Sequence, residues 1–212
     1  DMWIKRGIEK KIKCLAEQRP ALLLTGARQT GKTSLFKTLF QETPYLSLDL
    51  PSQAQEAETQ GELFLKNHPS PLIIDEVQYA PGIFRYLKAA IDEQRQKKGQ
   101  YLLTGSQKFV LMKNISDSLA GRIAICELET LGFFEVFSHY PHLSLDQFIL
   151  RGGFPELYAD IGLDRASFYQ SYVATYLERD VRSILQVGNL RDYDRFIRAC
   201  AYRSGQLLSK SD

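Results

Sequence analysis

Residues 21–36 contain the feature that most restricts what this chain can fold into. The run "ALLLT" is followed by "GARQTGKTSLF", which has the full G-x-x-x-x-G-K-[ST] spacing from Gly26 to Thr33. The apolar run predicts a buried strand, and residues 31–40 have helical spacing, so the glycines fall at a strand-to-helix turn. There, backbone N–H groups and the helix N-terminus suit a polyphosphate. The stretch predicts a loop that holds the phosphates of a nucleotide; an ordinary glycine-rich turn is the alternative.

Each part of this loop has an expected contact. Lys32 can reach the β- and γ-phosphates, and the hydroxyl of Thr33 is placed to bind Mg²⁺. The remaining candidate nucleotide-binding residues are Gly26, Ala27, Arg28, Gln29, Thr30, Gly31 and Ser34.

A phosphate-binding loop needs a partner for the metal, and "PLIIDEVQ" supplies one at the end of another apolar run. Asp75 is expected to hold Mg²⁺ through its water shell. Glu76 is placed to polarise a water molecule against the γ-phosphate as a general base. The adjacent acid favours hydrolysis over transfer of the phosphoryl group to a second substrate.

Two further polar positions are candidates for reading the γ-phosphate. "LLTGSQ" presents Ser106, and as second choice Thr104, at the end of the next predicted strand, although a plain turn is an alternative reading. Arg122, just ahead of the last predicted strand, is the candidate transition-state cation, with a surface or ion-paired arginine as the alternative. The other candidate arginines are Arg28, Arg151 and Arg179.

Short apolar runs alternate with helical patterns through the first two-thirds of the chain, which predicts a parallel sheet covered by helices. The later part, from about residue 130, is predicted to be all-helical, and its stripes of Phe and Tyr are expected to pack in a core. The expected strands are 21–26, 45–50, 71–76, 101–106 and 123–129, and the expected helices between them are 31–40, 54–66, 83–97 and 107–119.

The composition narrows the class of protein. The 212 residues are 44% hydrophobic and 25% charged, close to average globular usage. No apolar stretch is long enough to span a bilayer, so no membrane is expected and the cytoplasm is the expected location. The three cysteines form no CxxC pair, which indicates reduced, mostly buried thiols rather than zinc. The net charge of +2 does not by itself indicate a nucleic-acid partner.

Taken together, "GARQTGKTS", "LIIDEVQ", "YLLTGSQ", "SLAGRIAICELETLGFFEVF", "RGGFPELY" and "YLERDV" resemble the prokaryotic AAA+-superfamily ATPases that join a P-loop domain to a C-terminal domain of unknown function. In this resemblance Gly26 to Thr33 correspond to Walker A, and Asp75 and Glu76 to Walker B. Ser106 corresponds to the sensor-1 region and Arg122 to the family's Gly-Arg position.

The resemblance implies ATP binding and hydrolysis by a three-layer αβα sandwich with a five-stranded parallel sheet in the order 5-1-4-3-2. Residues 1–138 are expected to form the P-loop domain. Residues 139–212 are expected to form a helical lid or linker and the start of a truncated winged-helix or C-terminal domain. Family members usually continue further, so DNA binding through the missing part and self-association through Arg122 stay open.

Three functions follow as hypotheses. The first is Mg²⁺-dependent ATP hydrolysis coupled to a conformational change of the C-terminal helical region. The second is a nucleotide-gated DNA-binding or regulatory switch with slow hydrolysis, to which the basic residues of the N-terminus and of "RQKK" (95–98) are relevant. The third, a small-molecule kinase, lacks a clear arginine-rich lid. The sequence leaves the base contacts undecided, although residues 18–21, just before the first strand, are the usual neighbourhood.

Overall fold

The computed structural model describes residues 3–106, 108–177 and 190–206. The chain divides into two compact units, Asp1–Gly162 and Leu163–Asp212. The border predicted from sequence, between residues 138 and 139, falls inside the first unit and stays a prediction about domain organisation. Within the described ranges, no helix combines the length and the apolar character needed to cross a membrane.

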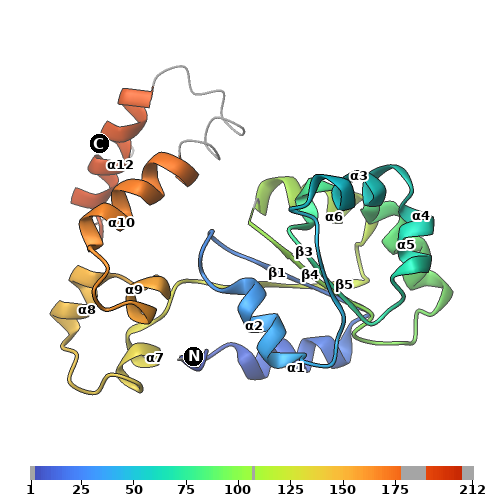
Figure 1. Cartoon of the computed structure of the whole chain (residues 1–212), viewed down its shortest axis with the longest axis horizontal. Coiled ribbons are helices and arrows are strands. Elements are labelled where there is room, and N and C mark those ends of the chain that lie inside the picture. Colours follow the sequence, from blue (N-terminus) through green and yellow to red (C-terminus); the bar gives the residue numbers. More distant parts are fainter. Residues whose placement is uncertain (1–2, 107, 178–189, 207–212) are drawn as a thin grey trace. The chain divides into compact units, whose positions relative to one another are not determined.

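The first unit is built on a parallel sheet of five strands in the order β2-β3-β4-β1-β5 (Figure 1). This is the predicted order 5-1-4-3-2 read from the other edge, so the predicted fold class is confirmed. In register, Leu23 of β1 lies between Leu103 of β4 and Ile125 of β5. The strands are β1 (Ala21–Thr25), β2 (Tyr45–Ser47), β3 (Leu72–Asp75), β4 (Tyr101–Gly105) and β5 (Ile123–Glu127).

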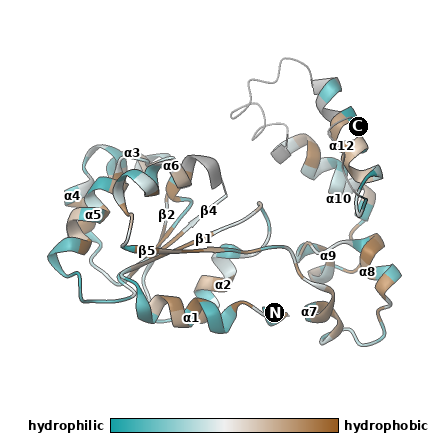
Figure 2. Ribbon diagram, turned by 180° about the vertical axis from the view of Figure 1, so that it is seen from behind, coloured by the Kyte–Doolittle hydropathy of each residue, from teal (hydrophilic) through white to brown (hydrophobic). Residues whose placement is uncertain are grey.

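Helices cover both faces of this sheet because its central strands are apolar on both sides (Figure 2). Alternate residues of β1 enter different cores: Leu22 and Leu24 pack with α1 and α2, whereas Ala21 and Leu23 pack with α3 to α6. Cys126 of β5 lies in the first of these cores. The helices are α1 (Glu9–Gln18), α2 (Lys32–Leu39), α3 (Pro51–Thr59), α4 (Gly61–Asn67), α5 (Ile83–Glu93) and α6 (Lys108–Ser118).

The single helix expected over residues 54–66 is wrong, because the structure has two helices there. Gln60 leaves the helical conformation with φ −130° and ψ 39°, which ends α3 and begins α4. A Cβ atom at Gly61 would lie 2.2 Å from Cδ2 of Tyr86 on α5. The break therefore brings a glycine against an aromatic ring, and this packing depends on contacts that helical periodicity does not record.

Three short helices follow β5 within the first unit. They are α7 (Phe133–Phe137), α8 (Leu145–Arg151) and α9 (Glu156–Ala159). The expectation that the phenylalanines of α7 pack in a core is wrong for two of them: Phe134 is 83% exposed and Phe137 40%. A helix of five residues buries one narrow stripe, and here the buried residue is Val136.

The "RGGFPE" segment does more than end a helix. Gly152 has φ 80° and closes α8. The carbonyl of Gly153 accepts a hydrogen bond of 2.7 Å from the N–H of Leu131. A Cβ atom at Gly153 would lie 2.4 Å from the carbonyl oxygen of Leu131, so the two backbones approach closely only because this residue is glycine.

The second unit contains α10 (Arg165–Tyr172), a π-helical stretch η2 (Val173–Leu177) and α12 (Leu190–Tyr202). Phe168 and Tyr172 are buried, and their rings stack with centroids 6.2 Å apart. The helical character predicted here is confirmed for these segments. The "YLERDV" motif extends past the described residues, and the candidate Arg179 lies outside them.

Candidate functional site

The loop between β1 and α2 has a backbone that only certain residues allow. Gly26 has φ 142°, and a Cβ atom there would lie 2.2 Å from the carbonyl oxygen of Leu128. Gly31, with φ 90°, begins α2 in the left-handed region, and Gln29 adopts φ 60° without being glycine. The hydroxyl of Thr30 donates to the carbonyl of Ala27 across 3.0 Å. The loop thus turns back on itself at the carboxyl end of the sheet.

Lys32 is buried inside this loop. Its Nζ atom donates to the carbonyl oxygens of Gly26, at 3.1 Å, and Ala27, at 2.7 Å. Burial lowers the pKa of Lys32 from its usual range, the carboxylates of Glu76 and Asp75 oppose this shift, and Arg28 adds to it. The loop therefore holds a desolvated amine beside two acids. A negatively charged ligand close to Nζ would stabilise the charged form of this amine, which burial disfavours.

Asp75, the last residue of β3, receives hydrogen bonds from three hydroxyl groups. Thr33 donates to Oδ1 across 2.7 Å, and Thr104 donates to the same oxygen. Tyr45 donates to Oδ2 across 2.9 Å. Carboxylate and hydroxyl oxygens are hard ligands of the kind Mg²⁺ prefers, usually together with substrate phosphates. The donor set formed by Thr33 and Asp75 therefore fits Mg²⁺.

Glu76 has an unusual backbone conformation, with φ 54° and ψ 46° in the left-handed region. For a residue other than glycine this costs about 1–3 kcal/mol and is typical of functional sites. Its Oε2 atom accepts hydrogen bonds from Nε2 of Gln78 and, at 3.4 Å, from the hydroxyl of Ser106. Its N–H donates to Thr104 across 3.2 Å. The structure therefore brings together Glu76 and Ser106, two candidates that follow the neighbouring strands β3 and β4.

Gln78 and Tyr45 are parts of this site that the sequence analysis missed. Gln78 lies in the 3₁₀ turn η1 (Val77–Tyr79), is 6% exposed, and contacts both Glu76 and Ser106. The signal that could have identified it is its place in "DEVQ", two residues after the acid. No motif marks Tyr45.

Arg122 does not lie with these residues. It precedes β5, and its carbonyl accepts a hydrogen bond from the N–H of Ala21, at the amino end of β1. The five residues of β1 separate that end from the phosphate-binding loop by about 16 Å, at about 3.3 Å per residue. Arg122 instead makes two hydrogen bonds to Asp92 of α5, of 2.7 and 2.8 Å. A contact between Arg122 and phosphates held by the same chain is therefore contradicted.

The other described candidate arginines have different surroundings. Arg28 lies within the loop, close enough to influence the pKa of Lys32. Arg151, at the end of α8, donates to the carbonyls of Leu157 and Ile161 and so supports the chain around α9. Both side chains therefore interact with their own chain, unlike an arginine finger that is available to contact a transferring phosphate.

An apolar pocket of about 220 Å³ adjoins the loop. Gln18 to Ala21, the neighbourhood suggested for base contacts, lie instead at the amino end of β1, away from the loop. Apolar pockets with a few polar groups suit flat heterocycles. The pocket residues ahead of α1, which include Trp3 and Arg6, are therefore better placed than Gln18 to Ala21 to contact a base. The pocket is lined by Trp3, Ile4, Arg6, Thr30, Gly31, Ser34, Leu131, Pro155, Glu156 and Ala159.

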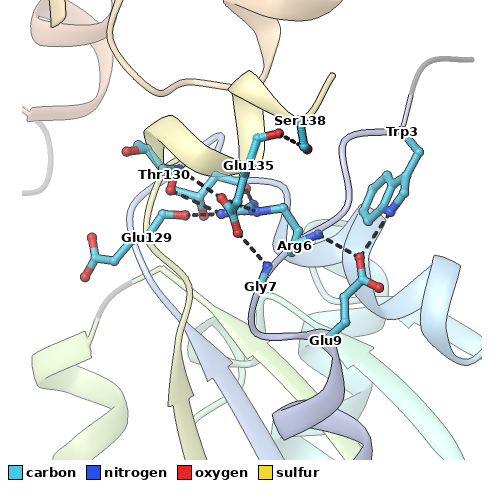
Figure 3. Close-up of polar contacts among 10 residues, drawn as sticks. Trp3, Arg6, Gly7, Glu9, Glu129, Thr130, Glu135 and Ser138 are labelled. Atoms are coloured by element: carbon cyan, nitrogen blue, oxygen red, sulfur yellow. Dashed lines mark hydrogen bonds and ion pairs between the residues drawn. The ribbon is translucent and has the colours of Figure 1, made fainter. Parts of the chain in front are cut away.

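One wall of this pocket is held by Arg6, which is 6% exposed (Figure 3). Its guanidinium donates to the carbonyl oxygens of Thr30, Glu129 and Thr130, at 3.0, 2.7 and 3.2 Å. It also pairs with the carboxylate of Glu135 on α7 across 3.3 Å. Arg6 therefore joins the N-terminal segment, the phosphate-binding loop and the connection from β5 to α7.

Comparisons with known proteins agree with this geometry. The family model described as an AAA domain matches residues 18–137, and a domain of unknown function matches residues 142–212. Two curated relatives, the uncharacterized proteins Rv2008c of Mycobacterium tuberculosis and Mb2031c of Mycobacterium bovis, are each 30% identical over 182 residues. Each match covers 85% of this chain and 40% of the relative, so the chain spans less than half the length of these relatives.

A solved structure shares the fold. The Walker-type ATPase PABY2304 of Pyrococcus abyssi matches with a TM-score of 0.58 and 17% identity, covering 99% of this chain and 86% of that one. The likeness extends over nearly all of the chain.

Proposed function

Because this chain belongs to the AAA-domain family and has the fold of a P-loop ATPase, we propose that it binds ATP with Mg²⁺ and hydrolyses it, coupling the nucleotide state to a conformational change of its C-terminal helical region. The observation that carries the proposal is the convergence of Lys32, Thr33, Asp75 and Glu76 at one end of the sheet. The proposal concerns this chain, since the relatives are much longer.

The roles follow from the contacts. Lys32 and the N–H groups of the loop bind the phosphates, and the pocket beside Trp3 and Arg6 takes the base. Thr33 and Asp75 would hold Mg²⁺, which when bound neutralises charge on the phosphates. Glu76 accepts a proton from the attacking water, and Ser106 orients that carboxylate by hydrogen bonding.

A nucleotide-gated switch with slow hydrolysis is the second candidate, and one observation favours it. Oε2 of Glu76 already accepts hydrogen bonds from both Gln78 and Ser106. Two donors on Oε2 hold the carboxylate in one orientation and leave Oε1 to accept the proton of an attacking water, which slows turnover if that orientation is not the reactive one. The two candidates differ in rate, whereas both require nucleotide binding by Lys32.

The test compares ATP affinity and Mg²⁺-dependent turnover of the wild type with those of Lys32→Ala and Glu76→Gln. We expect Lys32→Ala to lose binding, and Glu76→Gln to bind normally with turnover about 10²- to 10⁴-fold lower, the range typical of a lost general base. The controls are Lys66→Ala and Glu62→Gln, which alter an exposed pair on α4. If Glu76→Gln turned over ATP at the wild-type rate, Glu76 would not be the general base. If the wild type itself hydrolysed ATP too slowly for several turnovers, the switch would be favoured.

Coupling to the C-terminal region has its own readout. Hydrogen exchange of the α10 and α12 amides, compared between the ADP state and a non-hydrolysable ATP state, is expected to differ in the wild type. In Lys32→Ala the same comparison is expected to show no difference, since that variant binds neither nucleotide. Identical exchange in both states of the wild type would rule out the coupling.

A further inference from the structure

Tyr45 is the first residue of the edge strand β2. Its neighbour on β3 is Ile73, two residues before Asp75. The register pairs Tyr45 with Ile73 and Ser47 with Asp75. Because side chains alternate along a strand and match across a parallel pair, Tyr45 and Asp75 are on the same face of the sheet, the face that α2 covers. Its hydroxyl then extends along the strand direction to Oδ2 of Asp75.

The side chain of Tyr45 is held at both ends. Nζ of Lys37, on α2, lies 3.5 Å from the centroid of the ring, in a cation–π contact. The hydroxyl donates to Oδ2 of Asp75 across 2.9 Å. Tyr45 as a whole residue is 37% exposed, so burial alone does not account for a tyrosine at this position.

The hydroxyl of Tyr45 is distinguished by the oxygen that it contacts. Thr33 and Thr104 both donate to Oδ1 of Asp75, whereas Tyr45 donates to Oδ2. The two threonines hold Oδ1 of the Asp75 carboxylate. Tyr45 holds Oδ2 and so sets the rotation of the carboxylate about its bond to Cβ. An ionised carboxylate has about four acceptor sites, so these three bonds leave room for a water molecule bound to a metal.

We propose that Tyr45 is a positioning residue for the metal: its hydroxyl fixes Oδ2 of Asp75 so that Asp75 and Thr33 present their oxygens to Mg²⁺ together. This assignment rests on the proposed function. Hydrogen-bond donors behind a metal ligand orient it, and their removal usually lowers metal affinity about 10- to 100-fold. The role is specific to the metal, and it predicts no contact between Tyr45 and the nucleotide.

The experiment separates nucleotide binding from metal binding. The affinity for ATP is measured in EDTA and then across an Mg²⁺ titration, for the wild type, Tyr45→Phe and Tyr86→Phe. Tyr86→Phe is the matched control because Tyr86 lies on α5, against Gly61. We expect Tyr45→Phe to leave the affinity in EDTA unchanged and to raise the half-saturating Mg²⁺ concentration about 10-fold, with Tyr86→Phe behaving as the wild type.

Two results would overturn the assignment. An Mg²⁺ requirement of Tyr45→Phe equal to that of the wild type would show that the hydroxyl does not position the metal ligand. A loss of ATP affinity that is equal with and without Mg²⁺ would make Tyr45 a support of the loop alone. Failure of the proposed function would look different: the wild type itself would bind no ATP, with or without Mg²⁺. The assignment of Tyr45 would then fail as well.

Discussion

Nη1 of Arg6 lies 3.0 Å from the carbonyl oxygen of Thr30 and donates a hydrogen bond to it, which joins the chain ahead of α1 to the phosphate-binding loop. The same guanidinium reaches Glu129, Thr130 and Glu135, so one side chain connects segments more than 100 residues apart in the sequence (Figure 3). A planar fork of five donors suits this task, and a lysine could not reproduce it.

Replacing Arg6 with alanine is expected to lower the free energy of unfolding by about 3 kcal/mol, because three carbonyl groups lose their guanidinium donor and the Glu135 carboxylate loses its charged partner, keeping only backbone N–H donors. Urea denaturation measures the change. Arg6→Lys is expected to recover only part of it. Arg85→Ala, on the exposed surface of α5, is the matched control, and equal effects of Arg6→Ala and Arg85→Ala would contradict the prediction.

Gln78 is expected to support catalysis by holding Glu76. Gln78→Leu removes the amide that donates to Oε2, and the carboxylate is then held only by its longer, 3.4 Å hydrogen bond from Ser106. We expect turnover to fall about 10- to 100-fold, because small displacements of a catalytic group are costly, while the affinity for ATP stays unchanged.

Steady-state turnover and equilibrium binding of Gln78→Leu test this expectation, with Gln55→Leu on the exposed face of α3 as the control. A rise in turnover would mean that Gln78 restrains Glu76 instead of positioning it. That result would favour the slow-switch candidate.

Much of the fold and the centre of the site were predictable because they depend on local spacing. The G-x-x-x-x-G-K-[ST] pattern identifies Lys32 and Thr33, and the apolar run before Asp75 and Glu76 identifies β3. In a parallel sheet all strands end at one edge, so residues that follow different strands meet there. Asp75 and Thr33, 42 positions apart, are within 2.7 Å for this reason.

The remaining parts of the site depend on contacts that no local pattern records. Tyr45 meets Asp75 through the register of β2 on β3, and Arg6 belongs to a basic stretch that reads as an ordinary solvated helix face. Arg122 shows a different limit. It precedes its strand, and this order alone places it at the opposite edge from residues that follow strands.

The thiol groups offer a test of the packing of β5. The expectation of mostly buried cysteines is wrong, since Cys14 and Cys200 are exposed and only Cys126 is buried. Burial raises the pKa of the Cys126 thiol, so less of it is thiolate at pH 8 than of an exposed cysteine. We expect native protein to be alkylated quickly at Cys14 and slowly at Cys126, with the Cys126 rate rising as the pH increases.

Peptide mapping by mass spectrometry after brief exposure to iodoacetamide reads out each site separately. The control is the same reaction in urea, where all three thiols are expected to react at similar rates. Equal labelling of Cys126 and Cys14 in the native protein would show that the core between β5 and α1 is open to the reagent.

Arg122 is expected to have no effect on turnover within a single chain, because it lies at the amino end of the sheet and is paired with Asp92. The hydrogen bonds from Arg122 hold the pKa of the Asp92 carboxyl below its usual range, so the pair persists at neutral pH. Arg122→Ala is therefore expected to match the wild type at any protein concentration low enough for the chain to be monomeric, which sedimentation velocity would establish.

Self-association would change that outcome. If a second copy brings its Arg122 to the phosphate site, the wild-type rate per subunit rises with protein concentration while that of Arg122→Ala stays flat, as for an arginine finger donated by a neighbour. Arg85→Ala controls for loss of positive charge on a nearby surface. If Arg122→Ala were slower than the wild type even where the protein is monomeric, the placement of Arg122 away from the site would be contradicted. In a monomer no second copy is present, so only the chain's own Arg122 could account for the effect.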